Sequence, residues 1–425
     1  MNADKKVLAQ DIEWFVKHIG SRKSMLPTFA HVAGYHTRVV NEKLDKFIDQ
    51  HAYDKVLDED GRLLRYAVPE DYSGSHRILF TSLQHSRIFA DLLPKMTLVS
   101  LVSLFDAYLA RLFRIVLKLK PEILTGSEKY LTFAQLSEFE SLDAAKEYML
   151  EAEVESVLRE SHSAHFDWLE KRLGIPLRKD LPAWVEFMEI TERRNLLVHA
   201  DGVVNKQYIT ICENNKCPDA KLVKIGDRLG ADPEYYEKAC DCIAEIGVKL
   251  GYVIWSKLLP KDQEAADISA IQTTYDFLIR SEYKLAEMLA RFCTAGPIRQ
   301  SCIENSLYLK VNLAIAIRGQ DRVEDSKALI RSTDWSALSD KFKMASKVLL
   351  EEYDEAADIM RKLKGSKEFG KKDYRDWPLF RWFRRTDQFK SAYQDVFGEP
   401  FKIVQEKSAT DEGNQGEGQV GPVET

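Results

Sequence analysis

The chain has 425 residues, of which 45% are hydrophobic and 30% are charged, and its formal net charge is −6. These values are ordinary for a soluble globular protein, and the length suits two or three domains that each bury a core. The acidic balance excludes a protein that binds polyanions over its whole surface, so any nucleic-acid site has to be local.

The first 75 residues predict a helical extension to the rest of the chain. Apolar residues recur at helical spacing around Phe15 and again around Val40. We therefore expect two amphipathic helices, the first of which ends at Gly20. The sequence D-E-D-G at residues 58–61 predicts a turn, and residues 68–74 indicate a loop.

Residues 76–120 predict a helix with a wide apolar stripe between Leu98 and Val116, broken or kinked at Pro94. Asp106 lies at the edge of this stripe, where a carboxylate needs a polar partner. It is either an ordinary surface aspartate at the margin of the stripe or a group that orients other polar residues. Both interpretations remain open at this point.

Further helices are predicted before residue 260. Residues 143–160 indicate an acidic, solvated helix, and residues 161–173 indicate a helix that ends at Gly174. Residues 203–212 predict a short strand or a final turn, and Asp232-Pro233 begins a long helix, because proline suits the first turn. His162 and His165 lie three residues apart without an evident third ligand, so we interpret them as solvated or capping residues.

Residues 182–199 predict one helix that carries the most informative polar residues of the chain. Arg194, Asn195 and His199 form the pattern R-N-x-x-x-H at its C-terminal end, and Asp201-Gly202 supplies the stop. Because successive helical residues turn by about 100°, Asn195 and His199 share a face and Arg194 flanks them.

This combination of side chains suits cleavage of an RNA phosphodiester. Histidine can transfer protons near neutral pH, and arginine can stabilise the charge that builds on phosphate oxygens. Asparagine can orient the histidine or bind a phosphate oxygen, and such a scheme needs no metal. The alternative is chance, since an arginine and a histidine five residues apart occur on many helices. A histidine near a helix C-terminus also interacts favourably with the helix dipole.

The wider sequence resembles the HEPN superfamily, and within it the bacterial RiboL-PSP-HEPN-like proteins. Residues 193–208, R-R-N-L-L-V-H-A-D-G-V-V-N-K-Q-Y, match the family's R-N-x-x-x-H, its polar-glycine turn and its short hydrophobic segment that ends near a tyrosine. Three more segments fit the family in the same order, V-S-L-F-D-A-Y-L-A-R-L-F (102–113), K-R-L-G-I-P-L (171–177) and I-G-D-R-L-G-A-D-P-E-Y-Y (225–236). The resemblance therefore extends over residues 80–260.

The resemblance implies an all-α fold, with a HEPN-type helical bundle at residues 76–260 and the activity of a metal-independent endoribonuclease that leaves cyclic-phosphate ends. It implies that Arg194, Asn195 and His199 are catalytic, with Asp106 as an orienting residue, and that two protomers form a homodimer with a composite active site. We expect the neighbouring Arg193 to bind RNA. Many members of the family are bacterial toxins or antiviral defence proteins.

Some members of the family have lost catalysis, so two other functions stay open. One is a catalytically silent protein of this fold that binds RNA or a protein through its helices. The other is a purely structural helical scaffold in which His199 caps a helix, and the intact R-N-x-x-x-H pattern argues against it.

Residues 261–404 predict a C-terminal domain of helical hairpins. Apolar residues gather in short helices at 305–317, 323–330, 335–350 and 351–363, like a degenerate tetratricopeptide-like repeat without a clean thirty-four-residue period. Such helix pairs commonly bind proteins, so we expect a protein partner here. From residue 405 the composition turns to Gly, Glu, Gln and Ser, which predicts a disordered tail.

Residues 361–390 hold 11 basic residues against 4 acidic ones, interleaved with aromatic residues. Arg381, Arg384 and Arg385 in this segment could bind the RNA backbone while the aromatic rings stack on bases. In the alternative interpretation, which we favour, the aromatic rings pack the last helices and the charges are solvated.

The six cysteines are scattered without the spacing of a zinc site, so we expect neither a metal nor another cofactor. We interpret them as reduced thiols, as in a cytoplasmic protein. The N-terminus does not look like a signal peptide, and the most apolar run, residues 96–105, is too short to span a bilayer. We therefore expect no membrane partner.

Overall fold

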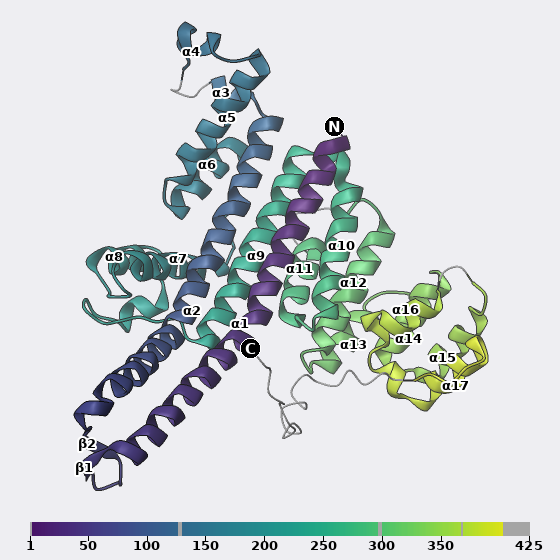
Figure 1. The fold of residues 1–425 in the computed structure, drawn as a ribbon. Helices are drawn as coiled ribbons and strands as arrows, with labels where there is room; N and C mark the ends of the chain where they lie inside the picture. The colour runs from purple at the N-terminus through teal and green to yellow at the C-terminus, as the bar shows by residue number, and fades with distance from the viewer. Residues whose placement is uncertain (1, 126–129, 296–299, 367–368, 403–425) are drawn as a thin grey trace. The chain divides into compact units, whose positions relative to one another are not determined.

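The protein is all-α, as the sequence predicts. In this computed structural model, residues 2–125, 130–295, 300–366 and 369–402 are described. The chain is about 75% helical, and the described part holds seventeen α-helices and one two-stranded sheet (Figure 1). The predicted tail at residues 405–425 lies outside the described residues. The chain divides into two compact units, Met1–Ala316 and Ile317–Thr425.

Two helices of 50 residues each dominate the first unit, α1 (Asn2–His51) and α2 (Glu70–Leu119). They run antiparallel and are joined by a hairpin of two strands, β1 (Tyr53–Leu57) and β2 (Leu63–Ala67), in which Leu57 pairs with Leu63. The turn between the strands is the predicted D-E-D-G turn, where the backbone N–H of Gly61 donates to the carbonyl of Asp58 at 3.0 Å.

Two predictions for this region are wrong. Helix α1 does not end at Gly20, and α2 already begins at Glu70, inside the predicted loop. Glycine lowers helix stability by only about 1 kcal/mol, which packing along a long helix easily outweighs. The start of α2 has local causes, because Pro69 precedes it and two acidic residues, Glu70 and Asp71, favour the positive end of the helix dipole.

The core of the first unit is built where α1 and α2 meet α9 (Pro233–Leu258). Phe15 of α1 stacks on Tyr108 of α2 with ring centroids 4.1 Å apart, and both side chains are fully buried. Gly247 and Gly251 of α9 face this pair so closely that a Cβ on either glycine would collide with it. Residues of the predicted extension at 1–75 therefore contribute to the core of the first unit.

Three more helices complete this core, α10 (Gln263–Ile279), α11 (Tyr283–Ala295) and α12 (Ile303–Arg318). Helices α10 and α11 pack on α9, and buried residues such as Phe277 and Leu289 belong to the same unit. The first compact unit thus continues to Ala316, beyond the predicted boundary at residue 260. A change of composition in the sequence does not reveal which helices share a core.

Shorter helices follow α2 and carry the candidate site. They are α3 (Glu122–Thr125), α4 (Phe133–Ser137), α5 (Leu142–Leu158), α6 (His162–Leu173), α7 (Ala183–His199), α8 (Lys206–Asn214) and the 3-10 turns η1 (Pro218–Lys221) and η2 (Pro260–Asp262). The predicted helices at 143–160, 161–173 and 182–199 are confirmed. Most of the segment 203–212 belongs to the helix α8, so the prediction of a short strand there is wrong. Val203 forms one isolated β-bridge with Arg228.

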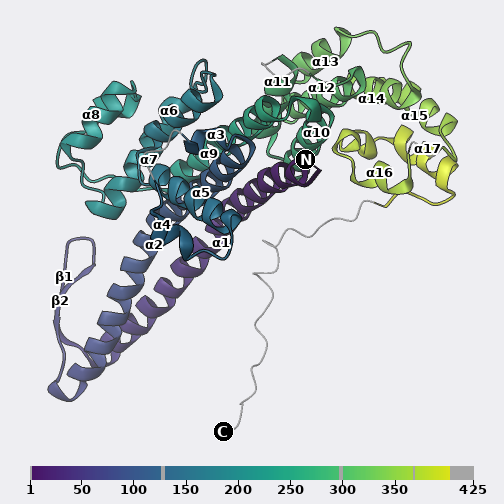
Figure 2. The same cartoon turned by 90° about the horizontal axis from the view of Figure 1, so that it is seen from above.

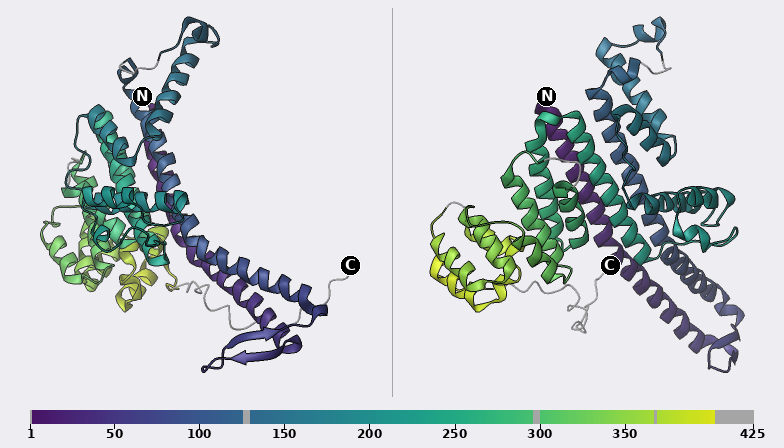
Figure 3. Two further views of the ribbon diagram at one scale, coloured as in Figure 1. Left: turned by 90° about the vertical axis from the view of Figure 1, so that its left-hand side faces the viewer. Right: turned by 180° about the vertical axis from the view of Figure 1, so that it is seen from behind.

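The outer parts of α1 and α2 run side by side away from α9 and end in the β1–β2 hairpin (Figures 2 and 3). We call residues 27–93 the arm. Both helices pass through a proline at its base, Pro27 in α1 and Pro94 in α2. A small buried cluster holds the arm together, formed by Val40, Leu44, Ile48 and Leu83.

The second unit consists of short helices. They are α13 (Val323–Arg331), α14 (Asp340–Leu350), α15 (Tyr353–Lys362), α16 (Lys371–Asp376), η3 (Pro378–Phe380), η4 (Phe383–Arg385) and α17 (Asp387–Phe397). Helices α14 and α15 pack against each other across a two-residue connection, which is the predicted helical hairpin. Helix α14 begins later than expected, because Trp335 is buried before it and donates its indole N–H to the carbonyl of Ile330.

Candidate active site

The R-N-x-x-x-H motif lies at the C-terminal end of α7, and the predicted glycine turn ends that helix. Asp201 and Gly202 both have positive φ angles, 49° and 78°. The N–H of Gly202 donates to the carbonyl of Leu196 at 3.0 Å, and a Cβ at Gly202 would collide with the carbonyl oxygen of Leu229. Glycine is therefore required where the end of α7 meets the loop before α9.

Arg194 is held by a carboxylate from a different helix. Its Nη2 donates to Oδ2 of Asp106 on α2 at 3.1 Å, and Nε2 of His162 on α6 lies 2.8 Å from Oδ1 of the same aspartate. Asp106 is one-third exposed, whereas the side chains of Arg194 and His162 are 20% and 9% exposed. Of the two interpretations of Asp106, the orienting one agrees with this geometry, because a solvated surface aspartate would not bridge two helices.

Asn195 contacts a second carboxylate of the site. Its Nδ2 donates to Oε1 of Glu192 at 3.2 Å, and Glu192 is buried. Burial raises the pKa of the Glu192 carboxyl, and the neighbouring His162, Asn195 and Arg194 offset only part of that effect. A hydrogen bond from Asn195 to Glu192 leaves the asparagine oxygen available to a ligand.

A polar pocket of about 520 Å³ joins these groups. Its lining includes all four predicted catalytic residues, Asp106, Arg194, Asn195 and His199. His199 is exposed at the end of α7, whereas the other three are partly buried. The structure thus brings together, on one concave surface, residues that are up to 93 positions apart in the sequence.

Two histidines were missed as members of this pocket. His162 and His165 are buried, not solvated or capping as the sequence indicated, and both line the pocket. Neither ring nitrogen of His165 has a hydrogen-bond partner within the described residues. Burial, with a smaller effect from His162, lowers the pKa of His165 from 6.5 to about 4. Their position just after the N-cap residue Ser161, on one face of α6, was the signal that could have identified them.

Arg193 points away from this pocket. Its Nε donates to Oε1 of Glu189 at 2.7 Å, and its guanidinium lies over the ring of Tyr235 at 4.0 Å. Glu189 also accepts from the hydroxyls of Tyr208 at 2.6 Å and Tyr235 at 2.7 Å, so the three side chains enclose its carboxylate. Burial lowers the pKa of Arg193, but Tyr235 and Glu189 more than offset this and raise it overall. The expected role of Arg193 in RNA binding is not supported, because its guanidinium is engaged in a buried network.

The three arginines expected to bind RNA near the C-terminus belong to the second unit. Arg384 donates to the backbone carbonyls of Tyr374 at 2.8 Å and Trp377 at 2.5 Å, which gives it a structural role. Arg381 is partly buried, and Arg385 is exposed. Most of the aromatic residues of this segment are buried, namely Phe369, Tyr374, Phe380, Phe383 and Phe389. The favoured interpretation, that these rings pack the last helices, is confirmed.

The pocket can bind an anion and move protons. Arg194 supplies a cation fixed by Asp106, and three histidine rings, those of His162, His165 and His199, line the same pocket and can exchange protons. Within the described residues, no group of three or more His, Cys, Asp or Glu side chains is placed to hold a metal ion.

We compared the chain with protein-family models, with curated proteins and with solved structures. None of the three comparisons found a match.

Proposed function

We propose that the protein is a metal-independent endoribonuclease of HEPN type that leaves cyclic-phosphate ends. The observation that carries this proposal is the pocket at the end of α7, where His199 and an arginine fixed by Asp106 line one concave surface. Arginine and histidine together provide charge stabilisation and proton transfer, which are the two requirements of phosphodiester cleavage.

In the proposed reaction, the ribose 2′-oxygen attacks the adjacent phosphorus and the bond from phosphorus to the 5′-oxygen breaks. The 2′-hydroxyl loses its proton, and the departing 5′-oxygen gains one. His199 transfers these protons, and Arg194 stabilises the negative charge of the phosphorane. Asp106 and Asn195 position the side chains of Arg194 and His199. The products are a 2′,3′-cyclic phosphate and a 5′-hydroxyl, so no water is consumed in this step.

The geometry of Arg194 supports its role as the phosphate ligand. One Nη atom is engaged by Asp106, while the buried Nε makes no hydrogen bond within the described chain. A buried donor without a partner is costly, and a phosphate oxygen would satisfy it. Glu192 and Asp106 in the same lining offset part of the positive charge of Arg194.

The proposal includes a homodimer with a composite active site. One end of one helix offers few polar groups, and His199 is exposed. A second copy related by a two-fold axis would enclose the phosphodiester and double the number of catalytic groups. We also propose that the protein acts in the cytoplasm as a bacterial toxin or antiviral defence effector, as many members of the family that it resembles do.

A catalytically silent RNA-binding or protein-interaction scaffold is the second candidate function. The helical hairpin of α14 and α15 favours it, because such hairpins commonly present a surface to a protein partner. Exposed basic groups such as Arg385 could add RNA contacts. Only a measurement of cleavage separates the two functions.

The test is cleavage of a panel of total RNA and single-stranded RNA in excess EDTA, with the ends of the products identified. We expect the wild type to cut, and His199→Ala and Arg194→Ala each to lose about 10²–10⁴-fold in rate. His31→Ala, an exposed histidine on α1 outside the pocket, is the matched control and should cut like the wild type. Cleavage that needs a divalent metal, or that survives both substitutions, would refute the mechanism and leave the scaffold function.

A further inference from the structure

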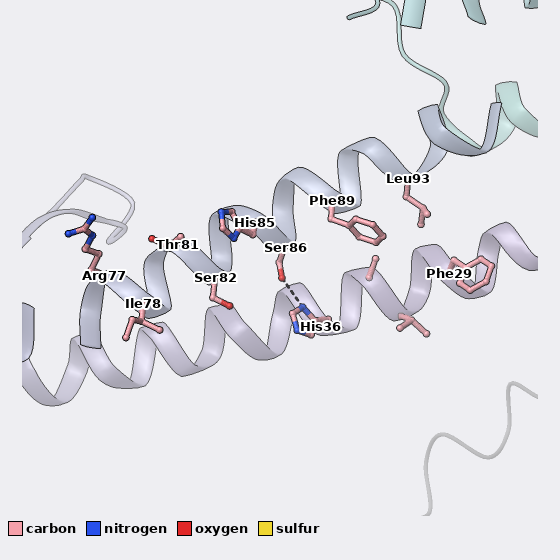
Figure 4. A pocket seen from close by; sticks show the side chains of 12 residues that line it. Phe29, His36, Arg77, Ile78, Thr81, Ser82, His85, Ser86, Phe89 and Leu93 are labelled. Carbon is pink, nitrogen blue, oxygen red and sulfur yellow. Dashed lines mark hydrogen bonds between the residues drawn. The ribbon is translucent and has the colours of Figure 1, made fainter. Parts of the chain in front are cut away.

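The arm carries a large apolar groove that is unrelated to the candidate active site. The groove lies between α1 and α2 and has a volume of about 880 Å³ (Figure 4). Its lining combines apolar residues such as Phe29, Ile78 and Phe89 with an equal number of polar ones, including Arg77. One polar contact crosses it, between Nδ1 of His36 and the hydroxyl of Ser86 at 2.7 Å.

Apolar side chains of the arm are exposed to an unusual degree. Ile78 is 72% exposed, Val32 is 58% exposed, and Phe29 and Phe89 are each 52% exposed. None of the residues 27–39 of α1 is buried. Scattered exposed apolar residues are normal, but a continuous apolar patch of this kind marks an interaction surface.

Apart from Arg77, which lines the groove, the same surface carries little charge. Residues 24–37 and 78–86 contain no Asp, Glu, Lys or Arg, in a chain that is 30% charged. A helix that faced only water would carry charged residues on its outer side. The pattern indicates that this part of the arm is covered in the working protein.

Charge is also distributed unevenly along the arm and its base. The tip, residues 41–76, holds nine acidic against five basic residues, a net charge of −4. The adjoining arm segments 27–40 and 77–93 hold three basic residues, Arg38, Arg77 and Arg87, against one acidic residue, Asp91, a net charge of +2. Two arms packed antiparallel would place the acidic tip of each against the basic base of the other.

We propose that this surface binds a second copy of the chain, so that two arms pack antiparallel about a two-fold axis as a four-helix bundle. The exposed side chains that border the groove, such as Phe29 and Phe89, would then insert into the groove of the partner. The same face of each arm therefore provides both the groove and the side chains that fill it. Self-complementary contacts of this kind are the commonest in homo-oligomers.

The size of the arm is sufficient for such a contact. About 25 residues of α1 extend beyond Pro27, which corresponds to a length of about 37 Å, and two helices side by side are about 20 Å wide. Each arm therefore offers roughly 700 Å², and two arms would bury roughly 1,400 Å², which is within the range of stable specific interfaces.

A bilayer is the main rival occupant. By length and composition alone, helix α2 is long and apolar enough to cross a membrane. The sequence prediction considered only the short apolar run at residues 96–105 and therefore did not anticipate this. Insertion of the arm, however, would carry its nine acidic and five basic tip residues into or across the hydrocarbon, at a large cost in free energy. The observations therefore favour a protein partner, specifically a second arm whose basic base faces the acidic tip of the first.

The first test is the oligomeric state of the full chain. The double variant Val32→Glu/Phe89→Glu introduces charge at two exposed positions, and Phe133→Glu makes the same change at a position that is 85% exposed outside the arm. In sedimentation velocity, we expect the arm variant to show half the mass of the wild type and of the Phe133→Glu control. Circular dichroism and thermal melting check that all three are folded.

A second test does not depend on destabilising substitutions. Single cysteines are introduced at Met25, Val32 or Glu42 in a Cys302→Ser background, which removes the exposed native thiol, and are treated with a short bis-maleimide. In an antiparallel two-fold contact, cross-linking should be strongest at one position and fall on both sides of it. Leu222→Cys, 80% exposed and outside the arm, is the control that should not cross-link.

A wild type that sediments as a monomer, or an arm variant with the mass of the wild type and no cross-linking, would overturn the proposal. Flotation of monomeric wild type, but not of the arm variant, with phosphatidylcholine vesicles would assign the surface to a membrane instead. The inference does not rest on the proposed ribonuclease activity. RNA cleavage by the same preparations is scored separately, so either idea can fail alone.

Discussion

Asp106 on α2 and Arg194 on α7 form an ion pair of 3.1 Å, although 88 positions separate them in the sequence. The pair connects a core helix to the end of the motif helix. Both side chains are largely shielded from water, so their attraction is less screened than that of a surface pair.

This shielding predicts energetic coupling between Asp106 and Arg194. A double-mutant cycle with Asp106→Ala and Arg194→Ala, measured by chemical unfolding, should give a coupling free energy of about 1 kcal/mol or more. The exposed pair Arg228–Asp201, whose side chains are 58% and 67% exposed, is the matched control and should couple by less than about 0.5 kcal/mol. Equal coupling in the two pairs would show that burial of the first pair is unimportant.

The proposed composite site predicts complementation between inactive variants. Mixing Arg194→Ala with His199→Ala protein allows heterodimers in which one protomer supplies the arginine and the other the histidine. If one site needs only one of each, the mixture should recover part of the RNA cleavage that neither variant shows alone. A fully active monomer in sedimentation at assay concentration would contradict the composite site.

His165 predicts loss of stability in mild acid. Its pKa is lowered by burial to about 4 in the folded protein, against 6.5 for an exposed histidine, so between these values the unfolded state binds more protons. The contribution of the neutral ring is complete above about pH 6.5 and decreases as the pH falls toward about 4, by roughly 3 kcal/mol. The neighbouring ionisable groups are His162 and Asp106.

The check is the free energy of unfolding across this pH range for the wild type and for His165→Phe, which cannot titrate. The difference between the two proteins should change by that amount in favour of the variant as the pH falls. Parallel pH dependences of the wild type and the variant would show that His165 is not held neutral by burial.

Arg193 and Arg194 are neighbours that should behave differently when replaced. Arg193→Ala leaves the buried Glu189 carboxylate without its cation, and removal of one partner of a buried ion pair typically costs about 3–5 kcal/mol. We expect a large fall in the melting temperature for Arg193→Ala and a smaller one for Arg194→Ala. The reverse order of melting temperatures would mean that the Glu189 network is not a structural support.

Arg384 and Arg385 offer a similar contrast in the second unit. Arg384 donates to two backbone carbonyls, whereas Arg385 is exposed. Arg384→Ala should destabilise the protein by about 1–3 kcal/mol, since two acceptors lose their donor, and Arg385→Ala should be neutral. RNA binding by this segment is therefore best tested with Arg385→Glu alone, by its effect on affinity and on the salt dependence of binding.

The parts of the fold that were predicted correctly have local causes. Gly174 and Gly202 have positive φ angles where α6 and α7 end, and Asp232 accepts a hydrogen bond from the N–H of Tyr235 at the start of α9. Such residues act within one turn of the chain, so their effect is visible in the sequence. The motif residues Arg194, Asn195 and His199 share one helix end for the same reason.

The parts that were missed depend on distant contacts. His162 was interpreted as solvated because its partner, Asp106, is 56 positions away. Arg193 was grouped with Arg194, but successive helical residues point about 100° apart, and only the positions of Tyr208 and Tyr235 decide which one is buried. The sequence predicts a helix end at Gly20, but α1 continues through it. The packing that stabilises α1 there involves α9, which lies more than 200 residues later and cannot be recognised from the local sequence.

The packing of Phe15 against Gly247 has a consequence for folding during translation. Helix α1 leaves the ribosome more than 200 residues before its partner α9, an interval on the order of ten seconds or more at typical elongation rates. During that interval the apolar side of α1 has only α2 to cover it. A chaperone that binds nascent helices should therefore associate with this chain until α9 emerges, and a substitution such as Gly247→Val would prolong that association.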